Sequence, residues 1–582
     1  MTIEDKKTTE NKAPYASNKN LTSKAKIFFP IIQWLPTYDK RNLRNDLIAG
    51  LTVGAVTVPE SMAYADLAGL PVEIGLYAAL VAPLLYVLFA TCRQMYVGPA
   101  STLSAMMAAP IAILAGEDPN RAVALAGFLA IIVGTTLLIF YAIKLGIISY
   151  FISNTVLVGF KAGAALFIIS SQLPKLFGIH GAGDNFFEKV TNIIVNLDQT
   201  HWISLAFGLS GIAFLLLGKR FFHRLPNKLI LVIVTTAVAG LAAYVGINLG
   251  IEKVGYIPDG LPPFSVPSVS QGDFLALLPT ALGIVLLTVV EGVAIGKTLS
   301  KKNGYQINTD KEILGWGASN AVTGFFSGLP VDASFSRSSI ADEDGAKTPL
   351  FNLFAAMVVG LVLLFFAAFF SNMPEPIIGA VIVFAVLSMI EIPAFKSIYA
   401  FDKKEFLVAI VAFFGVLFYG LLEGVLIGVL LTLLLFAYKS ISISMSVLGR
   451  IKGTEQYSDI ERHPGNESLP GIMILRANGP ILFTNAERLA EFVIKKVDAQ
   501  SAPVKLVVLD LSTGRILDKS MIDLLKDLEE ELKKRGIDFR LADVIGANRD
   551  TLQKAGLTKE FNLKDEAMTI DAVIKEWQQQ QA

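Results

Sequence analysis

The sequence has 582 residues, of which 53% are hydrophobic and 17% charged, and its mean hydropathy of +0.56 is too high for an ordinary soluble globular protein. Fifty lysines and arginines balance fifty aspartates and glutamates, so no net positive field attracts nucleic acid. The single cysteine, Cys92, excludes an internal disulfide and a CxxC zinc site, and the four histidines are scattered. The composition therefore excludes a cytosolic enzyme, and it predicts no nucleic-acid partner, no metal and no cofactor.

The charged residues are unevenly distributed along the chain. Residues 1–46 carry 14 charges, residues 47–448 carry 44, and residues 471–582 carry 35. This distribution predicts a cytoplasmic N-terminal arm (1–46), a transmembrane domain (47–448), a linker (449–470) and a cytoplasmic α/β domain (471–582). The arm has no apolar segment of the signal-peptide type, so we expect it to stay on the mature protein.

The transmembrane domain contains twelve stretches that approach the roughly 20 apolar residues needed to cross a bilayer. Two further stretches, 100–115 and 334–345, are too short or too polar to span alone. Counting both as half-length helices predicts about fourteen segments. The twelve longer stretches lie near 47–68, 74–91, 121–143, 147–170, 202–218, 228–249, 274–297, 312–328, 353–370, 376–390, 405–420 and 421–438.

Lysines and arginines fall on one predicted side of the membrane, as the positive-inside rule requires. They follow even-numbered segments, and the nine in the N-terminal arm place both termini on that same cytoplasmic side. The residues in this set are Arg93, Lys144, Lys219, Arg220, Arg224, Lys228, Lys301, Lys302, Lys311, Lys347, Lys403 and Lys404, with Lys439, Arg450 and Lys452 after the last segment.

The two short segments occupy equivalent places, third and tenth, in two sets of seven. Each follows a stretch rich in glycine and proline, YVGPAST at 96–102 and SGLPVDASFS at 327–336. Irregular backbone at membrane depth is tolerated around a cavity, and such a pair indicates a transporter built from inverted repeats. The alternative is two structural re-entrant loops, or one poorly hydrophobic full span.

Arg337 is the cation that this pattern places inside the membrane, one turn into the tenth segment and next to Ser334 and Ser336. A helix start attracts anions through its free N–H groups, and a guanidinium adds a full charge with forked donors. If the third segment begins near Ala100, Ser101 and Thr102, two helix starts face one anion. The alternative is that Arg337 only neutralises a buried carboxylate.

Placing an acidic side chain inside a membrane span costs free energy, so we expect each such residue to have a structural or functional role. Glu291 and Glu60 lie within spans, where either can carry a proton with the substrate or act as a protonated acid bonded to a neighbouring helix. Tyr64 is equally compatible with core and pocket. We interpret the other three charged residues as interfacial or packing charges: Lys161, Asp66 and Glu423.

Beyond residue 449 the pattern becomes that of a soluble domain in which helices cover a small sheet. GIMILRAN (471–478) and PILFTN (480–485) predict a hairpin around Asn478-Gly479. The later strands are VKLVVLDL and IDFRLAD, with an amphipathic helix between them.

Four motifs resemble the SulP/SLC26 anion transporter family: VPESMAYADLAGLPVEIGLYAAL, YVGPASTLSAMM, VVEGVAIGKTLSKKNGYQINTDKEILGWGASNAVTGFF and DASFSRSS. The C-terminal region resembles a STAS domain. The resemblance implies fourteen segments in a seven-plus-seven inverted repeat, divided into a core and a gate domain. It also implies a homodimer and an elevator-like movement.

The resemblance also assigns roles to residues. Its substrate-binding positions fall on Glu60, Tyr64, Ala100, Ser336 and Arg337, and its proton-coupling acid on Glu291. We expect the neighbouring residues Ser101, Thr102, Ser334 and Phe335 to belong to the same binding site, and Glu60 is a second candidate for proton coupling. The family often has Gln where this sequence has Glu60, and a carboxylate there opposes a dianion unless it is protonated. In the STAS-like region, Ser520 matches a phosphorylatable hydroxyl, although a helix N-cap is the simpler interpretation.

The sequence pattern predicts a multi-pass membrane transporter, and the resemblance implies a bacterial protein of the cytoplasmic membrane that takes up sulfate together with H⁺, with Na⁺ left open as the coupling ion. A regulatory protein on the STAS domain is a further expected partner. The alternatives are a bicarbonate or C4-dicarboxylate transporter, an anion channel, and a membrane-anchored signalling scaffold.

Overall fold

The computed structural model divides the chain into two compact units, Met1–Thr432 and Leu433–Ala582. The first unit is helical, and the second contains a mixed sheet covered by helices. The structure describes residues 29–116, 118–145, 153–222, 226–441, 444–479, 481, 485–512, 517–564 and 568–581.

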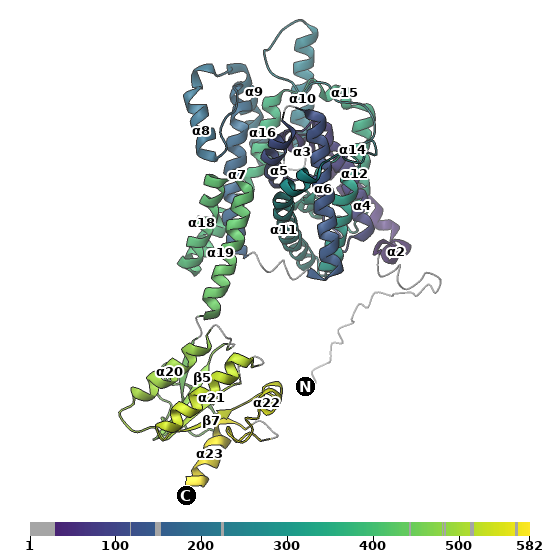
Figure 1. Ribbon diagram of the computed structural model, residues 1–582. Helices are drawn as coiled ribbons and strands as arrows, with labels where there is room; N and C mark the ends of the chain where they lie inside the picture. The colour runs from purple at the N-terminus through teal and green to yellow at the C-terminus, as the bar shows by residue number, and fades with distance from the viewer. Residues whose placement is uncertain are drawn as a thin grey trace, which may run out of the picture. The chain divides into compact units, whose positions relative to one another are not determined.

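The helices between Leu43 and Ile441, most of which are labelled in Figure 1, follow the predicted fourteen-segment order. Within the described residues, nine helices are long and apolar enough to cross a membrane. Short helices such as α2 (Ile31–Trp34), α8 (Phe186–Val195), α15 (Ala367–Phe370) and α17 (Ile392–Phe401) add to the fourteen. The half-length helices α5 (Ser101–Ala115) and α13 (Phe335–Glu343) are third and tenth in that order, as predicted.

The transmembrane helices pack as two groups. In the first helix group, α12 packs on α6 and α4, and α14 packs on α3 and α4. In the second, α7 packs on α18, α16 and α9, and α10 packs on α9. The first helix group comprises α3 (Leu43–Leu67), α4 (Val72–Phe89), α5, α6 (Pro119–Ala142), α11 (Gln271–Lys302), α12 (Thr309–Phe325), α13 and α14 (Phe351–Phe365). The second helix group comprises α7 (Asn154–Phe177), α9 (Trp202–Phe221), α10 (Asn227–Tyr244), α16 (Glu375–Leu387), α18 (Lys403–Tyr419) and α19 (Leu421–Ile441).

Glycines allow very close packing inside each group. A Cβ added at Gly134 of α6 would lie 2.2 Å from the Ala321 nitrogen of α12, and one at Gly159 of α7 would lie 2.0 Å from the Ala409 carbonyl oxygen of α18. Small residues let helix backbones approach in this way in membrane proteins. Within each group, therefore, these helices are joined through their backbones rather than through long side chains.

Two predicted segment boundaries differ from the structure. The fourth long stretch, predicted at 147–170, is α7 at Asn154–Phe177, because the Ser153 side chain caps its start and Gly178 ends it in a left-handed conformation. Residues 146–152 lie outside the described chain. The stretch predicted as one helix at 353–370 is broken at Phe366 into α14 and α15.

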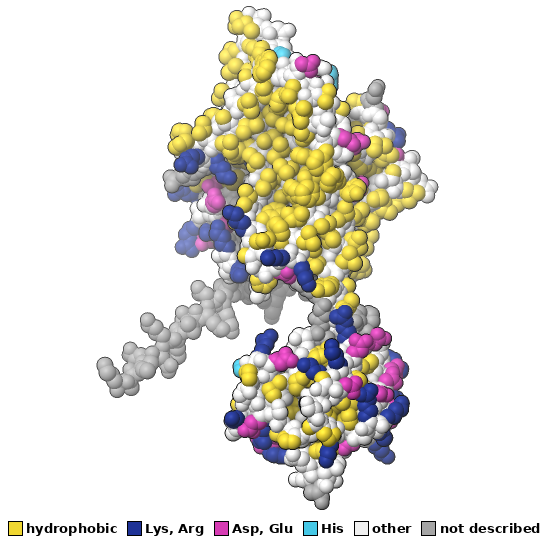
Figure 2. Space-filling view, turned by 90° about the vertical axis from the view of Figure 1, so that its left-hand side faces the viewer, with side chains coloured by type: hydrophobic (Ala, Val, Ile, Leu, Met, Phe, Trp, Pro, Cys, Tyr) yellow, Lys and Arg dark blue, Asp and Glu magenta, His cyan; other side chains and the backbone are white. Residues whose placement is uncertain are grey.

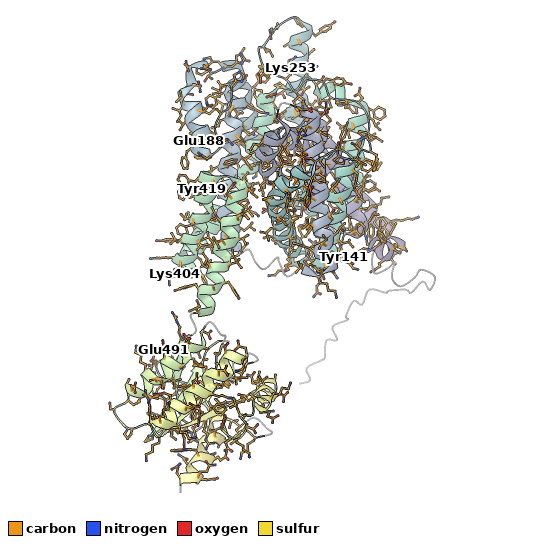
Figure 3. The ribbon with its side chains drawn as sticks, in the orientation of Figure 1. Tyr141, Glu188, Lys253, Lys404, Tyr419 and Glu491 are labelled. Carbon is orange, nitrogen blue, oxygen red and sulfur yellow. The ribbon has the colours of Figure 1, made fainter. Side chains whose placement is uncertain are left out.

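The surface of the first unit agrees with a lipid environment. Figure 2 shows a broad apolar face, and large hydrophobic side chains such as Leu217, Phe418 and Leu430 are exposed. Figure 3 places Tyr141, just before Lys144, at the same end of this unit as Lys404, while Glu188 and Lys253 lie at the opposite end. The loops after the fourth and twelfth segments are thus on one side.

The second unit is built on a five-stranded sheet with the order β4-β3-β5-β6-β7. Strand β6 is buried throughout, because α20 and α21 cover one face and α23 covers the other. The strands are β3 (Met445–Arg450), β4 (Tyr457–Asp459), β5 (Ile472–Ala477), β6 (Leu506–Asp510) and β7 (Asp538–Ala542), and the helices are α20 (Ala486–Asp498), α21 (Lys519–Lys534), α22 (Gly546–Lys554) and α23 (Ile570–Gln581).

Two details of this unit differ from the sequence predictions. The stretch predicted as a linker, 449–470, contains the end of β3 and all of β4, which pair in the sheet. The predicted hairpin partner of β5, residues 480–485, lies largely outside the described residues, and β5 pairs with β3 and β6 instead.

Ser520 is not a helix N-cap. Asp518 caps α21 by accepting a hydrogen bond from the Met521 N–H at 2.9 Å, and Ser520 is an exposed residue in the first turn. Its hydroxyl is therefore accessible, and its phosphorylation stays a prediction.

Candidate functional site

The two interrupted segments meet as a small antiparallel ladder inside the first helix group. Strand β1 (Val97–Gly98) pairs with β2 (Asp332–Ala333), with Val97 opposite Ala333 and Gly98 opposite Asp332. Each strand leads directly into a half-length helix, so the free N–H groups of α5 and α13 begin close to the same place. The Tyr96 carbonyl accepts from the Ser334 N–H at 2.9 Å, which extends the contact between the two segments.

Arg337 lies at this junction and is 1% exposed. Its Nη2 donates a hydrogen bond to the Pro99 carbonyl of the other segment, and its guanidinium lies 4.7 Å from the centre of the Tyr96 ring. Within the part of the chain that the structure describes, Nε and Nη1 of Arg337 have no hydrogen-bond partner. The junction therefore holds a buried cation with two unused donors.

Glu60, in the middle of α3, is the carboxylate nearest to this cation. It is 1% exposed, and its Oε2 lies 3.6 Å from the Arg337 Nε. Its other oxygen, Oε1, accepts a hydrogen bond from the Nζ of Lys228, in the first turn of α10. Glu60 is thus held between a guanidinium of its own helix group and an ammonium of the second group.

Lys228 was missed as a site residue, because the sequence grouped it with Lys219, Arg220 and Arg224 on the cytoplasmic side. The structure corrects that assignment by placing the Lys228 amine inside the protein. Pro226, just before α10, separates Lys228 from the cluster and was the available signal.

The predicted site residues are only partly brought together. Tyr64 lies one turn after Glu60 on α3, is buried, and has its ring centre 6.0 Å from the Arg337 guanidinium. Ala100 is the N-cap of α5, where Ser101 and Thr102 form the first turn.

On the other side, the Ser334 hydroxyl caps α13 by accepting from the Arg337 N–H at 3.4 Å. Phe335 is 56% exposed, and Ser336 is also exposed, so these two side chains are not part of the buried surroundings of the Arg337 guanidinium.

Asp332 of β2 interacts electrostatically with Arg337 and also with Glu291, which lies on α11. The Oε1 of Glu291 is 3.9 Å from the Nζ of Lys161 on α7, so the structure gives Lys161 a charged partner where the sequence suggested a packing or interfacial charge. Asp332 of β2, against which α11 packs, is fully buried. Its Oδ1 accepts from the Ala333 N–H at 2.6 Å, and its Oδ2 has no hydrogen-bond partner in the described chain. Asp332 was present in the DASFSRSS motif but was not singled out.

The structure also places Asp66 and Glu423, the remaining charged residues predicted from the sequence to lie inside the spans. Asp66, at the end of α3, pairs with Lys175 of α7 at 2.5 Å, and Glu423 of α19 is exposed. Among the described residues, no group of three or more histidines, cysteines, aspartates and glutamates is placed to hold a metal.

The fold is that of a known class of membrane transporters. It is similar to murine Solute Carrier 26 family member A9, an anion transporter solved in the inward-facing state, with a TM-score of 0.87, 23% identity, and coverage of 99% of this chain and 100% of that one. It is also similar to the transmembrane domain of the cyanobacterial bicarbonate transporter BicA, with a TM-score of 0.60, 20% identity, and coverage of 68% and 98%.

The sequence comparisons specify the family. The sulfate permease family model matches residues 43–412, and the STAS domain model matches residues 463–569. The chain is 33% identical over 539 residues to a probable sulfate transporter of Mycobacterium tuberculosis, covering 92% of this chain and 96% of that protein. It is 32% identical over 548 residues to probable sulfate transporter 4.2 of Arabidopsis thaliana, covering 91% and 80%. The chain therefore belongs to the sulfate permease family, and it is a multi-pass membrane transporter with a STAS domain rather than an enzyme.

Proposed function

We propose that this chain takes up sulfate together with H⁺ across the bacterial cytoplasmic membrane, with both termini in the cytoplasm. The main support for the proposal is the environment of Arg337, whose buried guanidinium lies between two helix starts and has two donor nitrogens without a hydrogen-bond partner among the described residues. The relatives named above as sulfate transporters support sulfate as the anion. Helix starts and a forked cation suit an oxyanion, because they supply several donors without a metal.

A proton has a specific use in this site. Glu60 lies against Arg337 and Lys228, which gives the three groups a net charge of about +1 when the carboxylate is ionised. Protonation of Glu60 removes its charge and leaves two cations for a dianion. Among the described residues, the groups that face this carboxyl are Lys228 from α10, Arg337 from α13, Tyr96 from the segment before α5, and Tyr64 from its own helix.

Glu291 is the second proton-coupling candidate. Its pairing with Lys161 joins α11 of the first helix group to α7 of the second. An elevator-like movement of one group past the other changes that distance, which couples the charge of Glu291 to the conformation. This is the geometric support for the role that the family resemblance assigns to it.

The direct test is uptake of radiolabelled sulfate into proteoliposomes under an imposed pH gradient. We expect accumulation when the side from which sulfate enters is acidic, and loss of accumulation when a protonophore collapses the gradient. Uptake that follows a Na⁺ gradient instead would overturn H⁺ coupling. Complete competition by bicarbonate or fumarate, with no saturable sulfate flux, would overturn sulfate as the substrate.

Glu291→Gln tests the coupling acid. We expect sulfate exchange to continue while gradient-driven accumulation is lost, because the amide cannot take up the coupling proton. The matched control is Glu423→Gln, which changes an exposed carboxylate in α19. A Glu291→Gln variant that kept the full pH dependence of the wild type would exclude Glu291 from coupling.

We also propose that the transporter is a homodimer and that its STAS domain, with Ser520 exposed on α21, is a regulatory surface. Light scattering of the purified protein measures the oligomeric state. Mass spectrometry of protein purified from the native host, with and without phosphatase treatment, measures phosphorylation of Ser520.

A further inference from the structure

Among the described residues, three ion pairs join the two helix groups, and the charges are arranged in the same direction in all three. Lys228 of α10 contacts Glu60 of α3, Lys175 of α7 lies 2.5 Å from Asp66 of α3, and Lys161 of α7 lies 3.9 Å from Glu291 of α11. In each pair the second helix group supplies the lysine and the first supplies the carboxylate. The boundary between the groups is thus crossed by ion pairs, and among the described residues Glu60 is the one of the three carboxylates that also lies within 4 Å of Arg337.

Of these lysines, Lys228 is the one joined to the candidate site. Its carboxylate partner is shared with Arg337, so the order of charges is Lys228, Glu60, Arg337. The Lys228 side chain is 11% exposed and that of Glu60 is 2% exposed, so water screens this arrangement weakly. In the part of the chain that the structure describes, no arginine lies within 4 Å of the Asp66 carboxylate that pairs with Lys175, and the second neighbour of Lys175 is Glu375 of its own group, at 3.7 Å.

The Glu60 carboxylate shares one feature with the proposed substrate, because both present anionic oxygens bonded to one central atom. It places one oxygen at Lys228 and the other at Arg337, as two oxygens of a bound oxyanion would be placed. The two unused donors of Arg337 show that Glu60 alone does not satisfy the guanidinium. A site of this composition accommodates an oxyanion between two cations that come from different helix groups.

We infer that Lys228 is a substrate-binding residue, supplied by the second helix group, and that Glu60 takes the place of the anion between Lys228 and Arg337 when no anion is bound. The inference rests on the proposed function to the extent that the substrate is an oxyanion, and it adds a residue and a helix to the site. It also adds a specificity determinant, because a dianion gains more than a monoanion from the second cation.

The competing explanation is that Lys228 only neutralises Glu60. The two explanations separate when the carboxylate is removed. If Lys228 only neutralises Glu60, the substitution Lys228→Met has no effect on anion binding in a Glu60→Gln protein. If Lys228 contacts the anion, the substitution still weakens binding there.

The experiment is calorimetric titration of sulfate, and separately of nitrate, into the purified full-length protein in nanodiscs. The proteins compared are wild type, Glu60→Gln, the double variant Glu60→Gln/Lys228→Met, and Glu60→Gln/Lys228→Arg. We expect the double Met variant to bind sulfate about tenfold or more weakly than Glu60→Gln, as for a lost charged hydrogen bond, with a smaller loss for nitrate and recovery by arginine. Elution profile and thermal unfolding identify any variant that fails to fold.

Lys175→Met is the matched control, because it removes a lysine of the same helix group from a pair that does not touch Arg337. We expect it to leave sulfate affinity within about twofold of the wild type. Equal sulfate affinity of Glu60→Gln and its Lys228→Met derivative would overturn the inference while the proposed function stood. If the wild type binds bicarbonate or fumarate but no sulfate, the proposed substrate is wrong, and the same variants titrated with that anion decide the role of Lys228. Binding of no anion would overturn both.

Discussion

The start of α5 and the start of α13 are equivalent in the repeat but differ in chemistry. Both follow a two-residue strand, and the strands pair with each other. The α5 start has Ala100 as its N-cap, with no side-chain cap and no charge. The α13 start has a serine cap and the buried Arg337, which donates to the Pro99 carbonyl before α5.

This difference shows that the two repeats contribute equally to the backbone geometry of the site but unequally to its charge. The shared backbone geometry directs two sets of N–H groups to one place, whereas a single side chain supplies the charge. An arginine at both starts would place two guanidiniums together, which is unfavourable in a buried setting. The asymmetry predicts that substitutions on the α13 side have larger effects than matched substitutions on the α5 side.

The largest effect is expected from removing the charge at α13. Arg337→Ala should weaken sulfate binding about thirtyfold or more, because truncating one member of a buried charged pair costs about 2–5 kcal/mol. Arg337→Lys should be intermediate, since an ammonium lacks the planar fork. Arg121→Lys is the control, as Arg121 pairs with Asp273 elsewhere in the first helix group and is half exposed. Calorimetric titration measures the sulfate affinity of all three variants. If Arg337→Ala bound sulfate as tightly as the wild type, the charge at the α13 start would not contribute to binding.

A smaller effect is expected on the α5 side from Gly98→Ala. The new Cβ would lie 2.7 Å from a ring carbon of Tyr96, the ring beside the Arg337 guanidinium, so that ring must shift. Overpacking of this kind costs about 1–3 kcal/mol. Thermal unfolding and sulfate titration should both report the change. Gly240→Ala in α10, where the added Cβ meets nothing within 4 Å, should leave both measurements unchanged.

The smallest effect is expected from the serine cap. Ser334→Ala removes the side chain that accepts from the Arg337 N–H and should cost about 0.5–2 kcal/mol of stability, with a lower melting temperature. Ser101→Ala, at the first position of α5, should cost less because Ser101 is not that helix's cap. Equal melting temperatures for the two variants would mean that the α13 cap has no special role.

The sequence predicted those parts of the site that depend on local signals. Glycine, proline and serine next to short apolar stretches indicated where α5 and α13 begin, and one-turn spacing placed Arg337 near the start of α13. Glu60 was identified because an acid inside a span needs a partner. These inferences use neighbours within a few residues of one another along the chain.

What could not be predicted depends on contacts across long stretches of sequence. Lys228 lies 168 residues from Glu60, and its charge suggested a cytoplasmic loop until the fold placed α10 beside α3. The partner of Lys161 required knowing that α7 faces α11. In the second unit, β3 and β4 were missed because strand pairing, rather than composition, distinguishes them from a linker.

The glycine contacts inside each helix group have a mechanical consequence. Where backbones touch, as at Gly134 against α12 and Gly159 against α18, a helix cannot slide without a steric clash. At the boundary between the groups, the ion pairs are made by lysines, whose long side chains can swing while their backbones stay in place. The backbone contacts at these glycines thus resist sliding within each group, whereas the ion pairs between the groups tolerate displacement, as the proposed movement of one group past the other requires.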